Sequence, residues 1–395
     1  MNIAIIELIP DGHYTLVESV ASIYLSDKSN AVTIITNQKG YDVLCHKISQ
    51  KLNIIVIKNE TETKDILGGL KVYDKIFMIT FEPISKKSFV LMNIFLKSKI
   101  EVPIYFFIHN IDIWFNQRFI DKIKNIFFKL DSFNVFIYRI KLYFYYYQIN
   151  KKIVSKVLNS GGAFATISNA VSNELAKFIS PSRIVTIPFS CFDESLMKLD
   201  DKDSKDKITI CIPGFVSNHR RDYFSVLKMF SNDSDSFIKN NFKFDFAGGL
   251  PLHEDITVLK REITKWKAEG YEIIIHETDY LKLVQFDECL EQSDLILGNL
   301  HIKVGLFGEY GKTKESGLAF TMIKAGKVGL IPSNYKIDDR LLSSTINFES
   351  YDDLIPVLKK IGQDSSFFQQ LKLNAIQNSK KFSPEKVYAE LESAV

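Results

Sequence analysis

The chain has 395 residues, a charged fraction of 25% and a formal net charge of +3. This length exceeds what one hydrophobic core ordinarily organises, and it fits two domains. The near-neutral charge excludes a chain-wide nucleic-acid-binding surface. Four scattered cysteines without a CxxC pair predict neither a zinc ribbon nor a disulfide framework, and they favour a reducing compartment.

The first half of the chain alternates nearly all-apolar runs with amphipathic segments. The apolar runs predict strands at 2–8, 31–36, 53–57, 75–80, 102–110, 163–168 and 183–189. Helical spacing of apolar residues predicts helices at 15–27 and 169–179. Because the strand runs do not alternate with polar residues, they indicate a parallel sheet covered on both faces.

A charged stretch separates the two halves. Residues 197–207 lack apolar periodicity and predict a linker between a first domain at 1–196 and a second at 208–380. A surface loop inside one domain is the alternative interpretation.

The second half repeats the pattern of the first. Its predicted strands are 207–214, 242–249, 271–277, 294–300 and 328–334, and its predicted helices are 221–232, 254–270, 283–293 and 317–326. Two further helices follow, broken at Ser383–Pro384. The whole is therefore an α/β protein of two successive domains. Ligands of such sheets bind beyond the carboxyl ends of the strands, so the cleft between the domains is the expected site.

Several motifs occur in a characteristic order along the chain: IPDGHY, FFIHN, ATISNAVSNELAKFISPSRIVTIPFSCFD, ICIPGFVSNHRRDY, ECLEQSDLILGN and KTKESGLAFTMIKAGKVGLIPSN. In this order they resemble the GT-B glycosyltransferases, most closely the broad superfamily that contains family 4. The resemblance spans nearly the whole chain. It implies two Rossmann-like domains facing a cleft, the second binding a nucleotide-sugar donor and the first an acceptor. It also implies that the C-terminal helix at 381–395 crosses back to the first domain.

One motif departs from the family pattern. Many family 4 enzymes have two glutamates eight positions apart at the donor-binding helix, and these would fall near Thr313 and Thr321. Glu315 is displaced from the first place, and no acid occupies the second. The chain therefore resembles a divergent subset, and the stereochemical outcome stays open.

Breaking the bond between a sugar and a diphosphate leaves extra negative charge on the diphosphate, which cations and backbone amides stabilise. The turn at Gly214 presents such amides. Arg220 and Arg221 offer forked donors suited to phosphate, and Arg221 is the one expected to face the cleft. A solvated basic turn is the alternative.

A second phosphate-binding candidate is the loop that opens the helix at 317–326. Lys314 can reach a phosphate, and Glu315 can accept hydrogen bonds from a sugar hydroxyl. Ser316 and Gly317 are expected at a helix N-terminus, where free amides bind anions. An ordinary helix cap with a charged surface loop is the alternative.

Three residues are candidates for catalysis. His109 ends an inner strand, His13 follows Gly12 in the first loop, and Glu82 follows the strand at 75–80. The resemblance places Gly12 near the donor phosphates. An inverting enzyme needs a base from this set, whereas a retaining one does not. Structural hydrogen bonding is the alternative for both histidines. No acidic motif of the metal-binding kind stands in a suitable place, so no metal and no obligatory cofactor are expected.

Residues 118–156 are basic and aromatic. Nine Lys or Arg and two Asp give them a net charge of +7, and eleven residues are Phe or Tyr. This composition suits an anionic membrane surface, where a lipid-linked acceptor would be found. The alternative is that the aromatic side chains pack against the first domain and the lysines are solvated. A nucleic-acid partner is not expected.

The sequence therefore predicts a glycosyltransferase of the hexosyltransferase type. Its donor would be a nucleotide-sugar, a UDP-sugar rather than a GDP-sugar, and its acceptor a saccharide or lipid-linked saccharide in surface polysaccharide or glycan biosynthesis. No window of the chain is apolar enough to cross a membrane. We therefore expect a cytoplasmic protein that acts at the inner face of the membrane if the basic segment binds lipid. A non-catalytic partner subunit and a sugar-nucleotide epimerase of the same fold are the alternatives.

Overall fold

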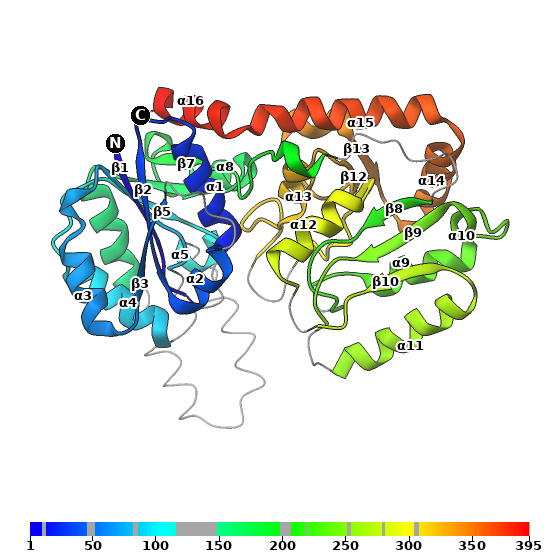
Figure 1. Ribbon diagram of the computed structural model, residues 1–395, viewed down its shortest axis with the longest axis horizontal. Coiled ribbons are helices and arrows are strands. Elements are labelled where there is room, and N and C mark those ends of the chain that lie inside the picture. Colours follow the sequence, from blue (N-terminus) through cyan, green and yellow to red (C-terminus); the bar gives the residue numbers. More distant parts are fainter. Residues whose placement is uncertain are drawn as a thin grey trace. The chain divides into compact units, whose positions relative to one another are not determined.

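The computed structural model describes residues 1–9, 13–45, 52–81, 86–115, 148–197, 207–218, 220–250, 254–278, 281–303 and 308–394. These residues form two compact units (Figure 1). The first unit is drawn from Met1–Phe189, Gly305–Glu315 and Val387–Val395, and the second from Ser190–Val304 and Ser316–Lys386.

The described part of the first unit contains a seven-stranded parallel sheet in the order β3-β2-β1-β4-β5-β6-β7. Its strands are β1 (Asn2–Glu7), β2 (Ala31–Asn37), β3 (Leu52–Ile57), β4 (Lys75–Met78), β5 (Ile104–Phe107), β6 (Ala163–Thr166) and β7 (Ile184–Thr186). The chain builds outward from β1 to β3 and then returns to add β4 on the other side of β1. The strand order therefore reverses between β1 and β4, and the carboxyl ends of strands at such a reversal are the usual place for a ligand in open parallel sheets.

Helices cover this sheet: α1 (Tyr14–Leu25), α2 (Gln38–Leu44), α3 (Glu60–Gly68), α4 (Lys86–Lys97), α5 (Ile111–Trp114), a helix at 148–159, and α8 (Asn169–Leu175). Neighbouring core residues on the central strands, such as Ile5, Phe77 and Phe106, are fully buried. The predicted parallel sheet with two covered faces is confirmed.

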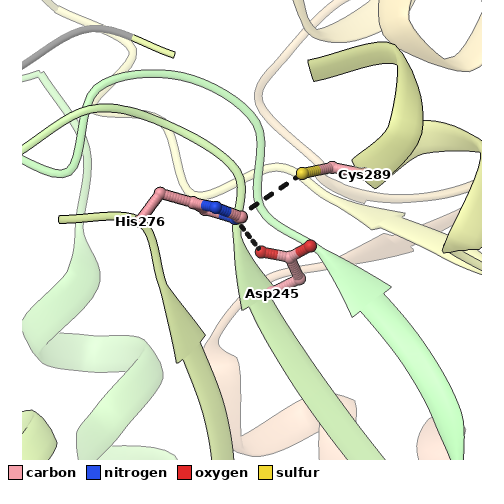
Figure 2. A group of neighbouring side chains, drawn as sticks. All are labelled: Asp245, His276 and Cys289. Atoms are coloured by element: carbon pink, nitrogen blue, oxygen red, sulfur yellow. Dashed lines mark hydrogen bonds and ion pairs between the residues drawn. The ribbon is translucent and has the colours of Figure 1, made fainter. Parts of the chain in front are cut away.

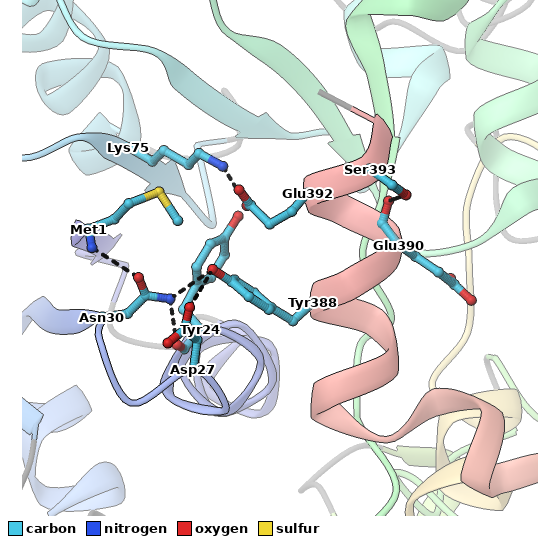
Figure 3. A network of polar contacts seen from close by, with 9 residues as sticks. All are labelled: Met1, Tyr24, Asp27, Asn30, Lys75, Tyr388, Glu390, Glu392 and Ser393. Atoms are coloured by element: carbon cyan, nitrogen blue, oxygen red, sulfur yellow. Dashed lines mark hydrogen bonds and ion pairs between the residues drawn. The ribbon is translucent and has the colours of Figure 1, made fainter.

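The end of the last helix, α16 (Pro384–Ala394), packs with the first unit from Val387 onward. Its Tyr388 hydroxyl donates to Asp27 at 3.2 Å, and its Glu392 forms a 2.6 Å ion pair with Lys75 (Figure 3). The amide of Asn30 donates both to Tyr388 and to the Tyr24 carbonyl. These contacts tie the chain's end to α1 and β4, so the predicted return of the C-terminal helix to the first domain is confirmed.

The described part of the second unit contains a six-stranded parallel sheet in the order β10-β9-β8-β11-β12-β13. Its strands are β8 (Ile208–Cys211), β9 (Phe242–Phe246), β10 (Glu272–Ile275), β11 (Leu295–Leu297), β12 (Val328–Pro332) and β13 (Thr345–Phe348). The order repeats that of the first six strands of the first sheet, with the reversal between β8 and β11.

Seven α-helices are described in this unit besides the start of α16. They are α9 (Tyr223–Met229), α10 (Phe237–Asn241), α11 (Glu254–Ala268), α12 (Leu283–Gln292), α13 (Leu318–Ala325), α14 (Leu354–Gln363) and α15 (Ser365–Ser379). The predicted break at Ser383–Pro384 is confirmed, because α15 ends before it and α16 begins at the proline.

Strands end earlier than the apolar runs suggested. The run at 102–110 yields a strand that stops at Phe107, which leaves His109 and Asn110 in the loop beyond the sheet. The edge strand β13 was not predicted, because its four residues include two polar ones and lie outside the apolar runs.

Parts of the predicted organisation fall outside the described residues. Positions 198–206 of the expected linker lie outside the described residues, and the linker stays a prediction. The expected second domain includes 308–315, and these residues group with the first unit.

Most of the basic aromatic segment, 116–147, also lies outside the described residues. Its end forms a helix whose Ile149, Ile153 and Val157 are buried. Lys156 on this helix donates to the Ser98 carbonyl and lies 5.0 Å from the Phe95 ring centre. The Lys156 side chain therefore contributes to the packing and hydrogen bonding of the first unit. Within the described ranges, no helix combines the length and the apolar character needed to cross a bilayer.

Candidate active site

A buried carboxylate stands at the carboxyl end of β1. The Glu7 side chain is fully buried, and one of its oxygens accepts the Ile9 amide at 2.9 Å. The other accepts the His13 amide at 3.1 Å and the Thr80 hydroxyl at 2.5 Å. Burial raises the pKa of Glu7 to about 7, although the hydrogen bonds from Thr80 and the two amides act to lower it. This carboxyl group therefore changes charge near neutral pH.

Thr80 connects this carboxylate to an imidazole. The Nδ1 atom of His13 lies 2.8 Å from the Thr80 hydroxyl oxygen. A hydroxyl has one proton, and when Thr80 donates it to ionised Glu7, the oxygen accepts a proton from His13 Nδ1. The Nε2 atom of His13 is then left with a lone pair. Glu7 and Thr80 thus select the tautomer in which His13 can act as a base.

A second imidazole stacks on the first. The rings of His13 and His109 have centroids 3.9 Å apart and an interplanar angle of 12°. Nε2 of His109 lies 2.8 Å from the Ile79 carbonyl, which only accepts, so this nitrogen carries the ring's proton. Burial lowers the pKa of His109 to about 4, against the raising effect of the Ile79 contact.

Burial also sets the charge of His13. Desolvation holds the pKa of His13 well below its usual range, and the neighbouring His109 and Lys314 lower it further. The charge of Lys314 contributes to the lowered pKa of His109 as well. Both rings are therefore neutral at neutral pH, as a base requires.

The loop at 308–315 is hydrogen-bonded to the rest of the first unit. Its Thr313 hydroxyl donates to the Asp112 carboxylate at 2.7 Å, and its Thr313 carbonyl accepts the Ile111 amide at 2.9 Å. Asn110 caps the same short helix by accepting the Asp112 amide at 3.0 Å. The loop therefore sits on the start of α5, directly after the strand that leads to the histidine.

The loop closes on itself through Glu309, whose carbonyl accepts the amides of Thr313 and Lys314. Gly308 and Gly311 adopt φ values of 125° and 73°, which residues with a side chain rarely take. This turn brings the Lys314 side chain to the histidines. Sequence reasoning placed Lys314 with Glu315, Ser316 and Gly317; the first two group with the first unit and the last two with the second.

In the second unit, the turn after β8 is built around an arginine. Gly214 has a φ of 102°, and a Cβ there would lie 2.3 Å from a guanidinium nitrogen of Arg221. Arg221 donates to the Asn299 side chain at 3.3 Å, just beyond β11. The side chain of Arg220 is exposed. The structure therefore brings Gly214 and Arg221 together at the reversal between β8 and β11.

Two helices begin near these residues in the sequence. Asp222 caps α9 by accepting the Ser225 amide at 3.0 Å. Gly317 is the N-cap residue of α13, and the Ser316 hydroxyl oxygen accepts the Leu318 amide at 3.2 Å. Ser316 and Gly317 thus stand at a helix N-terminus, where anions are favoured.

Gly12 and Glu82 lie outside the described residues, and their roles stay predictions. Sequence reasoning missed Glu7, Thr80 and Asn299. All three are polar residues that end or follow an apolar run, and this position is the signal that could have found them. Among the described residues, a group with metal-ligand chemistry is formed by Asp245, His276 and Cys289 in the second unit.

No protein-family model matches the sequence, and no curated protein matches it. Solved structures do resemble the chain over its whole length. A glycosyltransferase from Rickettsia africae has a TM-score of 0.65 at 12% identity, covering 100% of this chain and 97% of the other. HepE from Anabaena, solved with UDP-glucose, has a TM-score of 0.63 at 12% identity and full coverage of both chains. A UDP-N-acetylglucosamine 2-epimerase has a TM-score of 0.51 at 9% identity, covering 99% and 94%. The chain therefore has the two-domain α/β fold of the GT-B glycosyltransferases.

Proposed function

We propose that this chain is a glycosyltransferase that moves a sugar from a UDP-sugar to a hydroxyl group of a saccharide or lipid-linked saccharide in surface-glycan assembly. The observation that carries the proposal is the hydrogen-bonded chain from Glu7 through Thr80 to His13, at the strand reversal of a GT-B fold. It supplies a neutral imidazole with a defined tautomer where a reacting hydroxyl would need a base.

In this proposal His13 removes the proton from the acceptor hydroxyl. The acceptor oxygen forms a bond to the anomeric carbon of the sugar, and the bond from that carbon to the diphosphate oxygen breaks. The displaced group leaves as UDP, and the reaction inverts the anomeric carbon. The imidazolium formed on His13 is stabilised by ionised Glu7, which acts through the Thr80 hydroxyl.

The donor's diphosphate would be bound by Arg221 at the Gly214 turn and by the amides at the start of α13. A guanidinium binds two phosphate oxygens in one plane, and a helix N-terminus favours negative charge. Lys314 acts in the first unit, where its charge favours the neutral form of both histidines. As charge develops on the leaving group, the Arg221 guanidinium would stabilise it.

The likeness to a 2-epimerase of the same fold supports a second candidate function. An epimerase converts the nucleotide-sugar itself and needs no acceptor. In that case His13 would move a proton on the donor sugar and not on an acceptor hydroxyl.

A donor screen separates these functions. Purified chain is incubated with a panel of UDP- and GDP-sugars, with and without saccharide acceptors, and the products are analysed by mass spectrometry. A glycosylated acceptor together with free UDP supports the transferase. An isomerised nucleotide-sugar formed without acceptor supports the epimerase. If no nucleotide-sugar raises the melting temperature or gives product, both enzyme functions are refuted and a non-catalytic partner subunit is favoured.

The acceptor would reach the first unit at a membrane. The basic aromatic segment supports this part of the proposal, and its described lysines Lys151 and Lys152 are exposed. Co-sedimentation with vesicles of anionic and of neutral phospholipid tests it. Binding to anionic vesicles that weakens in Lys151→Glu/Lys152→Glu is the expected result, whereas equal binding to both vesicle types refutes membrane recognition by charge.

A further inference from the structure

Three side chains with metal-ligand atoms meet in the second unit (Figure 2). Asp245 lies in β9, His276 directly follows β10, and Cys289 lies on α12. Their ligand atoms are all within 4.8 Å of one another. Asp245 and Cys289 are buried, and the His276 side chain is 24% exposed. Three separate elements of the fold thus bring one oxygen, one nitrogen and one sulfur donor to one place.

Both contacts of the histidine use the same ring nitrogen. Nε2 of His276 lies 2.8 Å from the Asp245 carboxylate and 3.5 Å from the Cys289 sulfur. When Nε2 carries the ring's proton, it donates to the Asp245 carboxylate, and the Cys289 thiol hydrogen-bonds to the same carboxylate. A nucleophilic relay would need the carboxylate on the opposite ring nitrogen, Nδ1, with only the thiol on Nε2. The geometry therefore excludes a cysteine-nucleophile triad.

A cation between the three groups would replace these hydrogen bonds, since it binds the imidazole lone pair, the thiolate and the carboxylate together, and their ligand atoms are within 4.8 Å of one another. Tetrahedral zinc binds sulfur at about 2.3 Å and nitrogen or oxygen at about 2.0–2.2 Å, which places its ligand atoms roughly 3.3–3.8 Å apart. The separations of 2.8 and 3.5 Å are within small side-chain adjustments of that range. Thiolate and imidazole favour zinc over magnesium or calcium, which prefer oxygen ligands.

We propose that Asp245, His276 and Cys289 form a zinc site in the second unit, with its fourth position open to water or to an exogenous ligand on the exposed side of His276. The site joins β9, the loop after β10 and α12. The proposal does not depend on sugar transfer.

Metal binding at this site releases a proton. Zinc forms its bond to the Cys289 sulfur as the thiol proton leaves to solvent, so one proton is released for each thiolate formed. The affinity for zinc should therefore increase with pH across the neutral range.

Cobalt substitution tests the site directly. Tag-free full-length chain is reduced, stripped with a chelator and titrated with Co²⁺. One equivalent per chain should produce a thiolate-to-cobalt band in the near ultraviolet, and Zn²⁺ should displace it. The variant Cys289→Ser should lose this band and bind Zn²⁺ at least tenfold more weakly. Cys191→Ser is the matched control, because Cys191 is a buried cysteine of the same unit outside the cluster. This variant should keep the cobalt band and the wild-type affinity for Zn²⁺.

His276→Gln guards against a folding artefact, since this side chain is partly exposed and its replacement should leave the far-ultraviolet circular dichroism unchanged. It should weaken Zn²⁺ binding at least tenfold while keeping the secondary structure. The proposal is overturned if the folded wild-type chain binds no Co²⁺ or Zn²⁺ at micromolar concentration. It is equally overturned if Cys191→Ser loses the cobalt band as fully as Cys289→Ser does.

Discussion

Both units carry their candidate residues near the point where the strand order of a parallel sheet reverses, at or after the ends of β1, β4 and β5 in the first and after β8 and β11 in the second. In the first, the residues are a carboxylate, a hydroxyl and two stacked imidazoles, all of which handle protons. In the second, they are a glycine turn, a guanidinium and an amide, which suit a bound anion. One topology therefore supports two different chemistries.

This difference comes from the residues at the strand ends and not from the strands themselves. Most buried positions of the strands are apolar in both units, and Glu7 in β1 and Asp245 in β9 are polar exceptions. The one or two residues beyond each strand are released from that constraint, and they differ between the units. Substitutions at the candidate residues of the first unit should therefore affect proton transfer alone. Substitutions at those of the second unit should affect donor binding alone.

The largest expected effect is on the first unit's histidine. His13→Ala should lower kcat by about 10²–10⁴, the usual contribution of a general base, and leave the Kd of the donor within about threefold. Steady-state kinetics measure kcat, and calorimetric titration with the donor measures its Kd. His301→Ala, a partly buried histidine of the second unit, is the control. A variant of His13 with unchanged kcat would break the assignment of proton transfer to this unit.

The buried carboxylate should make stability depend on pH. The pKa of Glu7 is about 7 in the folded protein and about 4.5 in the unfolded chain. The folded state therefore binds the proton more tightly. Stability is thus highest below about pH 4.5 and falls as pH rises through 7, by about 3 kcal/mol. Glu7→Gln should remove this fall in urea unfolding measured from pH 4.5 to 8.

The same carboxylate should limit activity from the acid side. Because Glu7 must be ionised to accept the Thr80 proton, kcat should rise with pH through about 7, and this rise should be absent in Glu7→Gln. Glu349→Gln, at an exposed glutamate, serves as the control for both experiments. Identical pH profiles in all three proteins would contradict the role of Glu7.

Donor affinity should depend on the second unit. Arg221→Ala should weaken UDP-sugar binding by about 1.5–3 kcal/mol, roughly 10- to 150-fold, if the guanidinium binds the diphosphate. The neighbouring Arg220→Ala should change the Kd by less than about threefold, because its side chain is exposed and the turn is built around Arg221. Isothermal titration calorimetry measures both. Equal losses in the two variants would indicate a diffuse basic surface in place of a defined site.

The smallest effect is expected in the loop that carries Lys314. Thr313→Val removes the hydrogen bond to Asp112 and should destabilise the protein by about 1–2 kcal/mol in urea unfolding. Thr61→Val, at an exposed helical threonine, should change stability by less than about 0.5 kcal/mol. If the two variants behave alike, the loop is not held to the first unit by this contact.

Much of the fold was predictable, because parallel strands buried on both faces require continuous apolar runs. Every described strand except β13 overlaps a predicted run, and β2 and β3 extend one residue beyond theirs. Of the site, His13, His109, Gly214 and Arg221 could be named from their places after strands. Glu7 and Thr80 also end or follow apolar runs, but their contact could not be predicted, since a hydrogen bond between residues 73 positions apart leaves no local pattern.

The sequence by itself determined the two α/β units and the residue types that lie near the ends of their strands, because these follow from local periodicity and from turn and cap chemistry. Only the tertiary structure decided which of those residues meet. It paired His13 with His109, attached 308–315 to the start of α5, and gathered Asp245, His276 and Cys289 from three elements. Such meetings depend on strand order and register, which bring distant parts of the chain to the same edge of a sheet.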